Sequence, residues 1–168
     1  MQRETSLIII MKTATLKTLE QSDNVSLYSI CFNGQDISEY EAFLQKFKDD
    51  ATLNKDYKKI ILALEKIVAV GAFERFFRPE GKMSDHVAAL SIDSQKLRLY
   101  CLRISDQILI VGNGGVKNSR TYQENEELSG YVMDLQEFDK LLTEAQQNGS
   151  ITIEKNVITG IESKVFQL

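Results

Sequence analysis

Apolar residues recur with two different periods along this chain, and the changes of period predict where strands and helices lie. Alternation from Val25 to Phe32 predicts a strand, which the turn residues Asn33 and Gly34 end. Two helical stripes follow: Tyr40, Phe43, Leu44 and Phe47, then Tyr57, Ile60, Ile61, Leu64, Ile67 and Val68. The first stripe comes after a capping box of Ser38 and Glu41, and the second ends at Gly71. Two amphipathic helices in succession predict a helical hairpin packed on a sheet.

The pattern returns to strands after Pro79. We expect strands over Val87 to Ile92, Lys96 to Ile104 and Gln107 to Gly112. The short Ser105-Asp106 connection makes the last two an antiparallel hairpin. Residues 108–111 are apolar on both faces, which is typical of a central strand covered on each side.

The C-terminal third predicts one further helix and two short strands. Asp134 and Glu137 are placed to cap a helix that ends at Asn148-Gly149, with Leu135, Phe138, Leu141, Leu142 and Ala145 as its apolar stripe. Short strands follow over Ile151 to Glu154 and Ile161 to Phe166. The expected fold class is α+β: a helical hairpin on a mostly antiparallel sheet, with the C-terminal helix and short strands appended, in a single domain over residues 1–168.

Composition agrees with one globular domain, because 168 residues with 43% apolar and 26% charged content suffice for a sizeable core. Cys31 and Cys101 lie in alternating apolar runs, where free thiols behave as small hydrophobes. The chain has no Cys-x-x-Cys motif and no histidine cluster, so we expect no disulfide, no metal site and no cofactor. The apolar run from Leu7 to Met11 is shorter than a signal peptide or a membrane helix requires. We therefore expect a cytoplasmic protein without membrane association, in which Met11 is an alternative start.

The charge is distributed unevenly. The net charge is −4, yet residues 75–120 hold eight basic and four acidic side chains and so carry +4, against −8 for the remainder. The basic residues are Arg75, Arg78, Lys82, Lys96, Arg98, Arg103, Lys117 and Arg120. Such a distribution is typical of a phosphate-binding face on an acidic body, and equally of a solvated basic face that compensates acidic helices.

The order of a strand, two helices and then at least three strands, the last of which ends in a basic tail, resembles the RelE/HigB/ParE superfamily of bacterial toxins. Lys96 to Arg103 looks like the arginine-bearing central strand of that family, and Gln107 to Val111 looks like the apolar strand after it. The glycine at 112, followed by Lys117, Arg120 and Tyr122, is similar to the end of that strand in the family. The resemblance covers residues 25–122 and leaves 123–168 as a C-terminal extension. This chain departs from the family in its acidic balance, its greater length and its Gly112 to Gly115 insert.

The resemblance implies the toxin component of a toxin-antitoxin system, acting as a metal-independent mRNA endoribonuclease. It places Arg98 and Arg120 on the scissile phosphate, because guanidinium groups make two parallel bonds to phosphate oxygens, and assigns proton transfer to Tyr122 or Lys117. The residues that it implies for RNA binding are Arg75, Arg78, Lys82 and Arg103. The implied partners are an antitoxin, of helix-turn-helix type in some systems, RNA and the ribosome. Two alternatives stay open: a non-catalytic binding module of the same fold, and a ParE-like toxin acting on a non-RNA target such as topoisomerase.

Several of these residues also have structural interpretations. Arg98 and Tyr100 share a strand face, which is either a functional face or the solvated side of an edge strand. Arg103 falls in phase with buried residues, which implies a bulge or a buried paired charge. Tyr122 is either a catalyst or a packing lid, and the sole histidine, His86, is more typical of a surface or capping residue than of a catalyst.

Two further groups have a structural and a functional interpretation. Phe73, Phe76 and Phe77 either stack on bases or anchor the turn after the second helix, and the anchor is favoured. The glycines from Gly112 to Gly115 predict a flexible turn or bulge with positive φ where the backbone comes close to a partner, rather than a nucleotide fingerprint.

Overall fold

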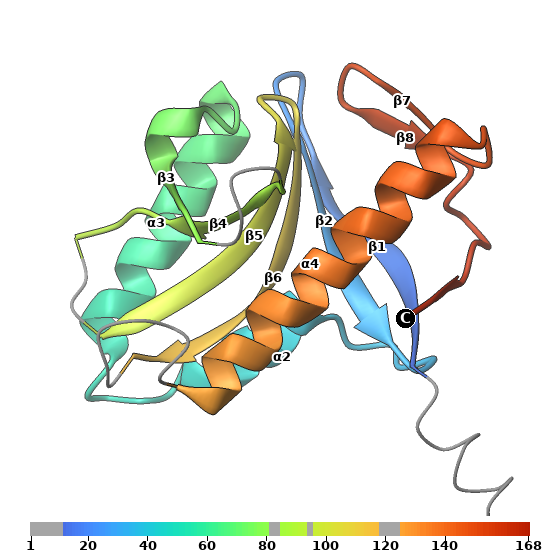
Figure 1. Cartoon of the computed structure of the whole chain (residues 1–168). Coiled ribbons are helices and arrows are strands. Elements are labelled where there is room, and N and C mark those ends of the chain that lie inside the picture. Colours follow the sequence, from blue (N-terminus) through green and yellow to red (C-terminus); the bar gives the residue numbers. More distant parts are fainter. Residues whose placement is uncertain (1–11, 81–84, 94–95, 118–124) are drawn as a thin grey trace, which may run out of the picture.

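The structure is a computed structural model that describes residues 12–80, 85–93, 96–117 and 125–168 (Figure 1). Its centre is one sheet in the order β3-β4-β5-β6-β2-β1-β9. The bounds are β1 (Thr13–Gln21), β2 (Ser26–Phe32), β3 (Phe77–Pro79), β4 (Val87–Leu90), β5 (Leu97–Ser105), β6 (Ile108–Val116) and β9 (Phe166–Gln167). Of the pairs between these strands, β2 and β6 run parallel and the others antiparallel, so the expected α+β class with a mostly antiparallel sheet is confirmed.

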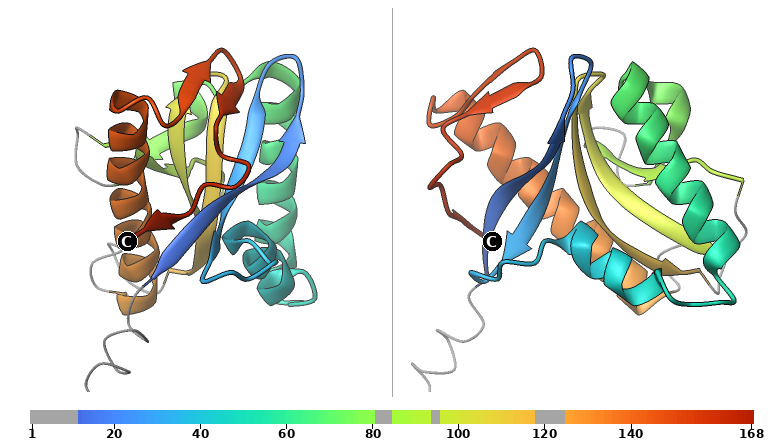
Figure 2. Two further views of the ribbon diagram at one scale, coloured as in Figure 1. Left: turned by 90° about the vertical axis from the view of Figure 1, so that its right-hand side faces the viewer. Right: turned by 180° about the vertical axis from the view of Figure 1, so that it is seen from behind.

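Helices cover both faces of the sheet. Figure 2 shows α2 (Glu39–Phe47) and α3 (Asn54–Val70) on one face and α4 (Glu126–Gln147) on the other. The short hairpin of β7 (Thr152–Glu154) and β8 (Val157–Thr159) follows α4. Buried side chains form two clusters accordingly: the α4-side core, which includes residues of α4, β8 and β9, and the α2/α3-side core. The C-terminal segment is therefore part of the main core.

Strand β6 lies between β5 and β2 and is buried on both faces. Ile108 and Ile110 belong to the α4-side core, and Leu109 and Val111 belong to the α2/α3-side core. This confirms the prediction of a central strand from its continuous apolar run. The side chains of β5 also alternate between the two faces of the sheet. Leu99 and Cys101 face α2 and α3, whereas Tyr100 and Leu102 face α4.

The predicted start of α2 and the predicted end of α3 are confirmed. Ser38 and Glu41 form the capping box of α2, and Gly71 ends α3 with a φ of 119°, in the region that favours glycine. The predicted start of the third helix at Asp134 and Glu137 is wrong: α4 begins at Glu126, with Asn125 as its N-cap. Leu128 and Val132 extend the apolar stripe towards the N-terminus, which gives the longer helix its buried face.

Three strand predictions need correction. The strand β1 over Thr13–Gln21 was not predicted, and β6 continues to Val116 instead of ending at Gly112. The expected strand from Ile161 to Phe166 is replaced by β8 and by the two-residue β9, which pairs with Thr13 and Ala14. The strands β8 and β9 are short, and short strands give weak periodic signals because they contain few residues on which alternation can be seen.

Both cysteines are free and buried, as expected, and burial raises the pKa of the Cys101 thiol to about 12.

The glycines of β6 form a bulge in the strand. Leu99 pairs with Gly114 and Cys101 with Val111, so Gly112 and Asn113 both lie opposite Tyr100. The predicted bulge and close backbone approach are therefore present, but the predicted positive φ is wrong, since the glycines with positive φ in the described chain are Gly34, Gly71, Gly149 and Gly160.

No helix in the described part of the chain is both long and apolar enough to cross a membrane.

Replacement of Gly114 by alanine tests the close approach of β6 to β5. A Cβ at this position would lie 1.8 Å from the carbonyl oxygen of Arg98, so Gly114→Ala is expected to destabilise the fold by about 3 kcal/mol in urea or thermal unfolding. Gly130→Ala is the matched control: it lies in α4 with nothing within 4 Å of a built Cβ, and is expected to stabilise by roughly 0.5–1 kcal/mol. Equal stability of the two variants would contradict the packing argument.

Candidate functional site

Two of the predicted catalytic residues, Arg98 and Lys117, lie at the same end of the sheet. Arg98 pairs with Gly115 across the β5–β6 ladder, and the backbone N–H of Lys117 donates to the carbonyl oxygen of Lys96 at 2.7 Å. Adjacent antiparallel strands thus place the first residues of β5 beside the last residues of β6. The alternative in which Arg98 and Tyr100 form the solvated side of an edge is wrong, because β5 lies between β4 and β6 and Tyr100 is 1% exposed.

Arg98 is a half-buried cation with a second arginine nearby. Its guanidinium donates from Nη1 to the carbonyl oxygen of Leu97 at 3.2 Å. Burial lowers the pKa of Arg98, and the positive charge of Arg78 lowers it further. Arg78 lies on β3, two strands away, and pairs with Glu80 at 3.4 Å. This end of β5 therefore places two arginines near each other in a partly desolvated place, where electrostatic interactions are stronger than in water, and Glu80 and Asp56 offset part of their charge.

Arg103, predicted as an RNA-binding residue, lies at the opposite end of β5. Five residues of strand separate it from Arg98, which corresponds to about 17 Å. Its Nε donates to the carbonyl oxygen of Ala72 at 2.7 Å, and its guanidinium also pairs with Asp106 and, at 3.7 Å, with Glu74. Arg103 is a partly buried paired charge, with a side chain 18% exposed, and the β5–β6 register also shifts between Arg103 and Ser105, so the paired charge and the bulge that its phase implied are both present.

The aromatic residues after α3 anchor the turn. Phe76 and Phe77 pack against the α2/α3-side core, which favours the predicted anchoring role. The exposed guanidinium of Arg75 lies 4.8 Å from the ring centre of Phe73 and 4.7 Å from that of Phe76, as in cation-π pairs. Arg75 and Arg78 are thus held on the surface of one short segment.

The other predicted site residues, Lys82, Arg120 and Tyr122, lie outside the described residues. The residues on either side of 118–124 are placed at the Arg98 end of the sheet. Asn125 donates from Nδ2 to the carbonyl oxygen of Val116 at 3.3 Å. The described chain therefore leaves β6 and enters α4 at nearly the same point.

A pair that the sequence did not predict joins β4 to α4. Nδ1 of His86 lies 2.8 Å from Oδ1 of Asp139, and the backbone N–H of His86 donates to Oδ2 of the same carboxylate at 3.0 Å. Asp139 is 6% exposed, so its carboxylate is a nearly buried group held by one residue through two contacts. The hydrogen bond to Asp139 raises the pKa of His86, and burial opposes this. The other ring nitrogen, Nε2, has no hydrogen bond to any described residue.

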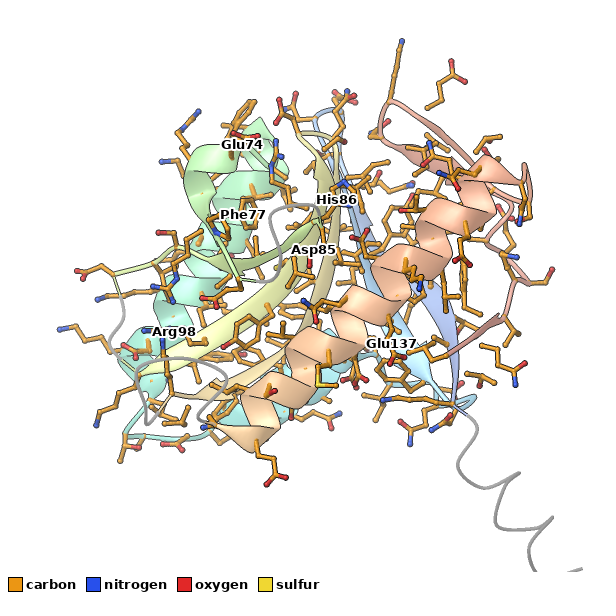
Figure 3. All side chains as sticks on the ribbon, in the orientation of Figure 1. Glu74, Phe77, Asp85, His86, Arg98 and Glu137 are labelled. Carbon is orange, nitrogen blue, oxygen red and sulfur yellow. The ribbon has the colours of Figure 1, made fainter. Side chains whose placement is uncertain are left out.

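This pair lies beside an open cavity of about 490 Å³. Its lining includes Glu74, Phe77, Pro79, Asp85, His86 and Arg103. Figure 3 shows Glu74, Phe77, Asp85 and His86 grouped around the start of β4, whereas Arg98 lies towards the other end of β5. A carboxylate that fixes one imidazole nitrogen leaves the other oriented for hydrogen bonding or proton transfer, as in catalytic His-Asp pairs.

The signal for this pair was present in the sequence but weak. Asp139 lies in phase with Leu135 and Leu142 on the apolar stripe of α4, where a carboxylate is buried only if it has a partner. The partner is 53 positions away, so only the tertiary structure shows it.

Within residues 12–80, 85–93, 96–117 and 125–168, no group of three or more histidine, cysteine, aspartate or glutamate side chains is placed to hold a metal ion. Comparisons of this chain with protein-family models, with curated proteins and with solved structures gave no match.

The His86–Asp139 pair predicts a pH-dependent contribution to stability. Because the folded-state pKa of His86 is raised, its contribution is fully present below the unfolded value of roughly 6.5 and is lost as the pH rises through the folded pKa. Asp85 and Arg103 also act on the ring, with opposite signs. NMR titration of the single histidine is expected to show the raised pKa, and Asp139→Asn is expected to lower it and flatten the pH dependence of unfolding.

Glu137→Gln is the control for this titration, since it removes one charge from an exposed position of the same helix, away from His86 (Figure 3). Equal His86 pKa values in the Asp139→Asn variant and the unsubstituted protein would show that the pair does not hold the proton.

Proposed function

We propose that this protein is a RelE/HigB-like toxin component of a toxin-antitoxin system and acts as a metal-independent mRNA endoribonuclease. The observation that supports this most is the segment from β2 to β6, in which one strand is followed by α2, α3 and then the strands β3, β4, β5 and β6, an order similar to that of the toxin superfamily. These strands lie side by side in one sheet as β3-β4-β5-β6-β2, with Arg98 and Lys117 at adjacent ends of β5 and β6. These are the positions where the resemblance expects the cations of the active site.

The chemistry requires positive charge at one phosphate. In the cleavage step a general base removes the proton of the ribose 2′-hydroxyl, the 2′-oxygen attacks phosphorus, and the 5′-oxygen leaves with a proton from a general acid. The bond formed is 2′-O–P and the bond broken is P–5′-O. Negative charge collects on the non-bridging oxygens, and we propose that Arg98 and Arg120 stabilise it while Lys117 or Tyr122 transfers the proton.

The flanking phosphates would follow the exposed side of the segment after α3. Arg75 and Arg78 are exposed there and belong to the same short segment. Arg103 is expected to contribute less than the sequence suggested, because Asp106 and Glu74 already neutralise its charge. We further propose a cytoplasmic protein whose basic surface an antitoxin covers and whose RNA target is presented on the ribosome.

Substitution of Arg98 tests the catalytic proposal. Arg98→Ala is expected to lower the rate of mRNA cleavage in EDTA, with and without ribosomes, by about 10²–10³-fold, which is typical for loss of one group that stabilises a developing oxyanion. Arg98→Lys is expected to recover part of the rate, because an ammonium keeps the charge but not the two parallel bonds. Lys140→Ala, an exposed change on α4, is the charge control, and thermal unfolding shows whether each variant is folded.

The same assay separates the alternatives. Cleavage by the unsubstituted protein that is unaffected by Arg98→Ala and Arg120→Ala would contradict the assigned site. Absence of cleavage, together with growth arrest and DNA damage on expression, would favour a ParE-like toxin. Absence of both effects would favour a non-catalytic binding module.

A further inference from the structure

The cavity beside His86 combines apolar walls with hydrogen-bond acceptors. Phe77 and Pro79 supply flat apolar surface from β3, and Glu74 and His86 supply polar atoms at the rim. Its volume of about 490 Å³ is in the range of small-molecule sites, which usually pair an apolar surface with a few placed polar groups.

The charges around the cavity favour a ligand that donates hydrogen bonds and carries no negative charge. The guanidinium of Arg103 is paired with Asp106 and with Glu74 at 3.7 Å, and the ring of His86 is paired with Asp139 at 2.8 Å. Asp85 adds another carboxylate to the lining. A phosphate here would meet more negative than positive charge, whereas an N–H group would find acceptors.

His86 is arranged to serve as one of these acceptors. When neutral, its ring donates from Nδ1 to Asp139, which places the lone pair on Nε2. The carboxylate of Glu74, whose side chain is 87% exposed, is a second acceptor on the other side of the cavity. Two acceptors and an aromatic ring match the amino-bearing edge and the face of a nucleobase.

The surroundings of the cavity fit a base that is attached to an RNA chain. Arg75 follows Glu74 directly, and Arg78 lies between Phe77 and Pro79 on β3, where successive side chains point to opposite faces of the sheet, so both exposed cations lie on the same segment as lining residues but outside the lining itself. The charge of Arg78 acts on Arg98. In an RNA chain, nucleotides next to a base bound in the cavity would therefore meet these cations outside the cavity, whereas the phosphate of the bound nucleotide itself would lie beside the acidic lining.

We propose that the cavity between η1 (Glu74–Phe76), β3 and the start of β4 is a nucleobase subsite that selects an unpaired base with an exocyclic amino group. This inference rests on the proposed RNA function and names the substrate feature that the protein reads. His86 and Glu74 accept hydrogen bonds from the base, Phe77 packs against its ring, and Asp139 positions His86.

Nucleoside titration tests the subsite without any RNA cleavage. The single histidine gives one set of ring signals, so His86 is observed directly by NMR. Cytidine, adenosine or guanosine, at pH values where His86 is neutral, is expected to shift these signals with a dissociation constant on the order of millimolar. Uridine, which lacks the amino group, is expected to bind at least about tenfold more weakly, as for one lost hydrogen bond. The 5′-monophosphates are expected to bind no tighter than the nucleosides.

Substitutions then connect the subsite to RNA. Glu74→Gln is expected to abolish the difference between cytidine and uridine in the His86 signals. Both Glu74→Gln and His86→Gln are expected to reduce base preference in cleavage of short RNAs while the cleavage chemistry persists. Glu137→Gln, distant from the cavity, is the control and is expected to leave both unchanged (Figure 3).

The outcomes distinguish the two proposals. If the unsubstituted protein cleaves RNA but no nucleoside shifts His86, or if uridine binds as well as cytidine, the subsite is wrong and the ribonuclease proposal stands. If amino-bearing nucleosides bind selectively but RNA is neither bound nor cleaved, the cavity recognises such bases and the RNA function is wrong. Tighter binding of the monophosphates would overturn the charge argument for the cavity.

Discussion

The burial of β6 on both faces is the constraint on which the remaining structure depends. A strand covered by helices on each side must satisfy its backbone polar groups with neighbouring strands and must let both layers approach closely. Here the glycines at 112, 114 and 115 permit that approach. A Cβ at Gly112 would lie 2.9 Å from the carbonyl oxygen of Tyr100, and one at Gly115 would lie 3.1 Å from Leu128 of α4. The glycines between 112 and 115 thus let α4 and β5 pack against the central strand.

This packing determines where polar chemistry is available. Because α4 covers the face of the sheet that includes Tyr100 and Leu102, the middle of that face is core and has no room for substrate. Polar side chains remain at the two ends of β5. Arg98 lies at one end, and Arg103 lies at the other beside His86 and the cavity. The proposed function follows this division, with phosphate chemistry at the first end and base recognition at the second.

The acidic side chains around the Arg103 end of β5 are the physical reason why the two ends of the strand are assigned different roles. The basic residues of the segment 75–120 do not all contribute to one phosphate-binding face, because Arg103 pairs with Asp106 and Glu74. Neutralised cations hold structure, while an exposed one such as Arg75 can exchange water for phosphate. The net charge of a segment therefore says less about its function than the partners that each charge finds.

The sequence by itself determined the elements whose signals are local. Periodicity, caps and turns act within a few residues. They predict the strand before Asn33, the start of α2 after Ser38, the end of α3 at Gly71, and the run at 108–111 that is buried on both faces. Only the tertiary structure decided that β2 lies parallel to β6, that Gly112 and Asn113 bulge opposite Tyr100, and that Asp139 meets His86. Each of these depends on residues a dozen or more positions apart. The free energy that selects one pairing over another comes from tertiary packing, which a local sequence pattern does not contain.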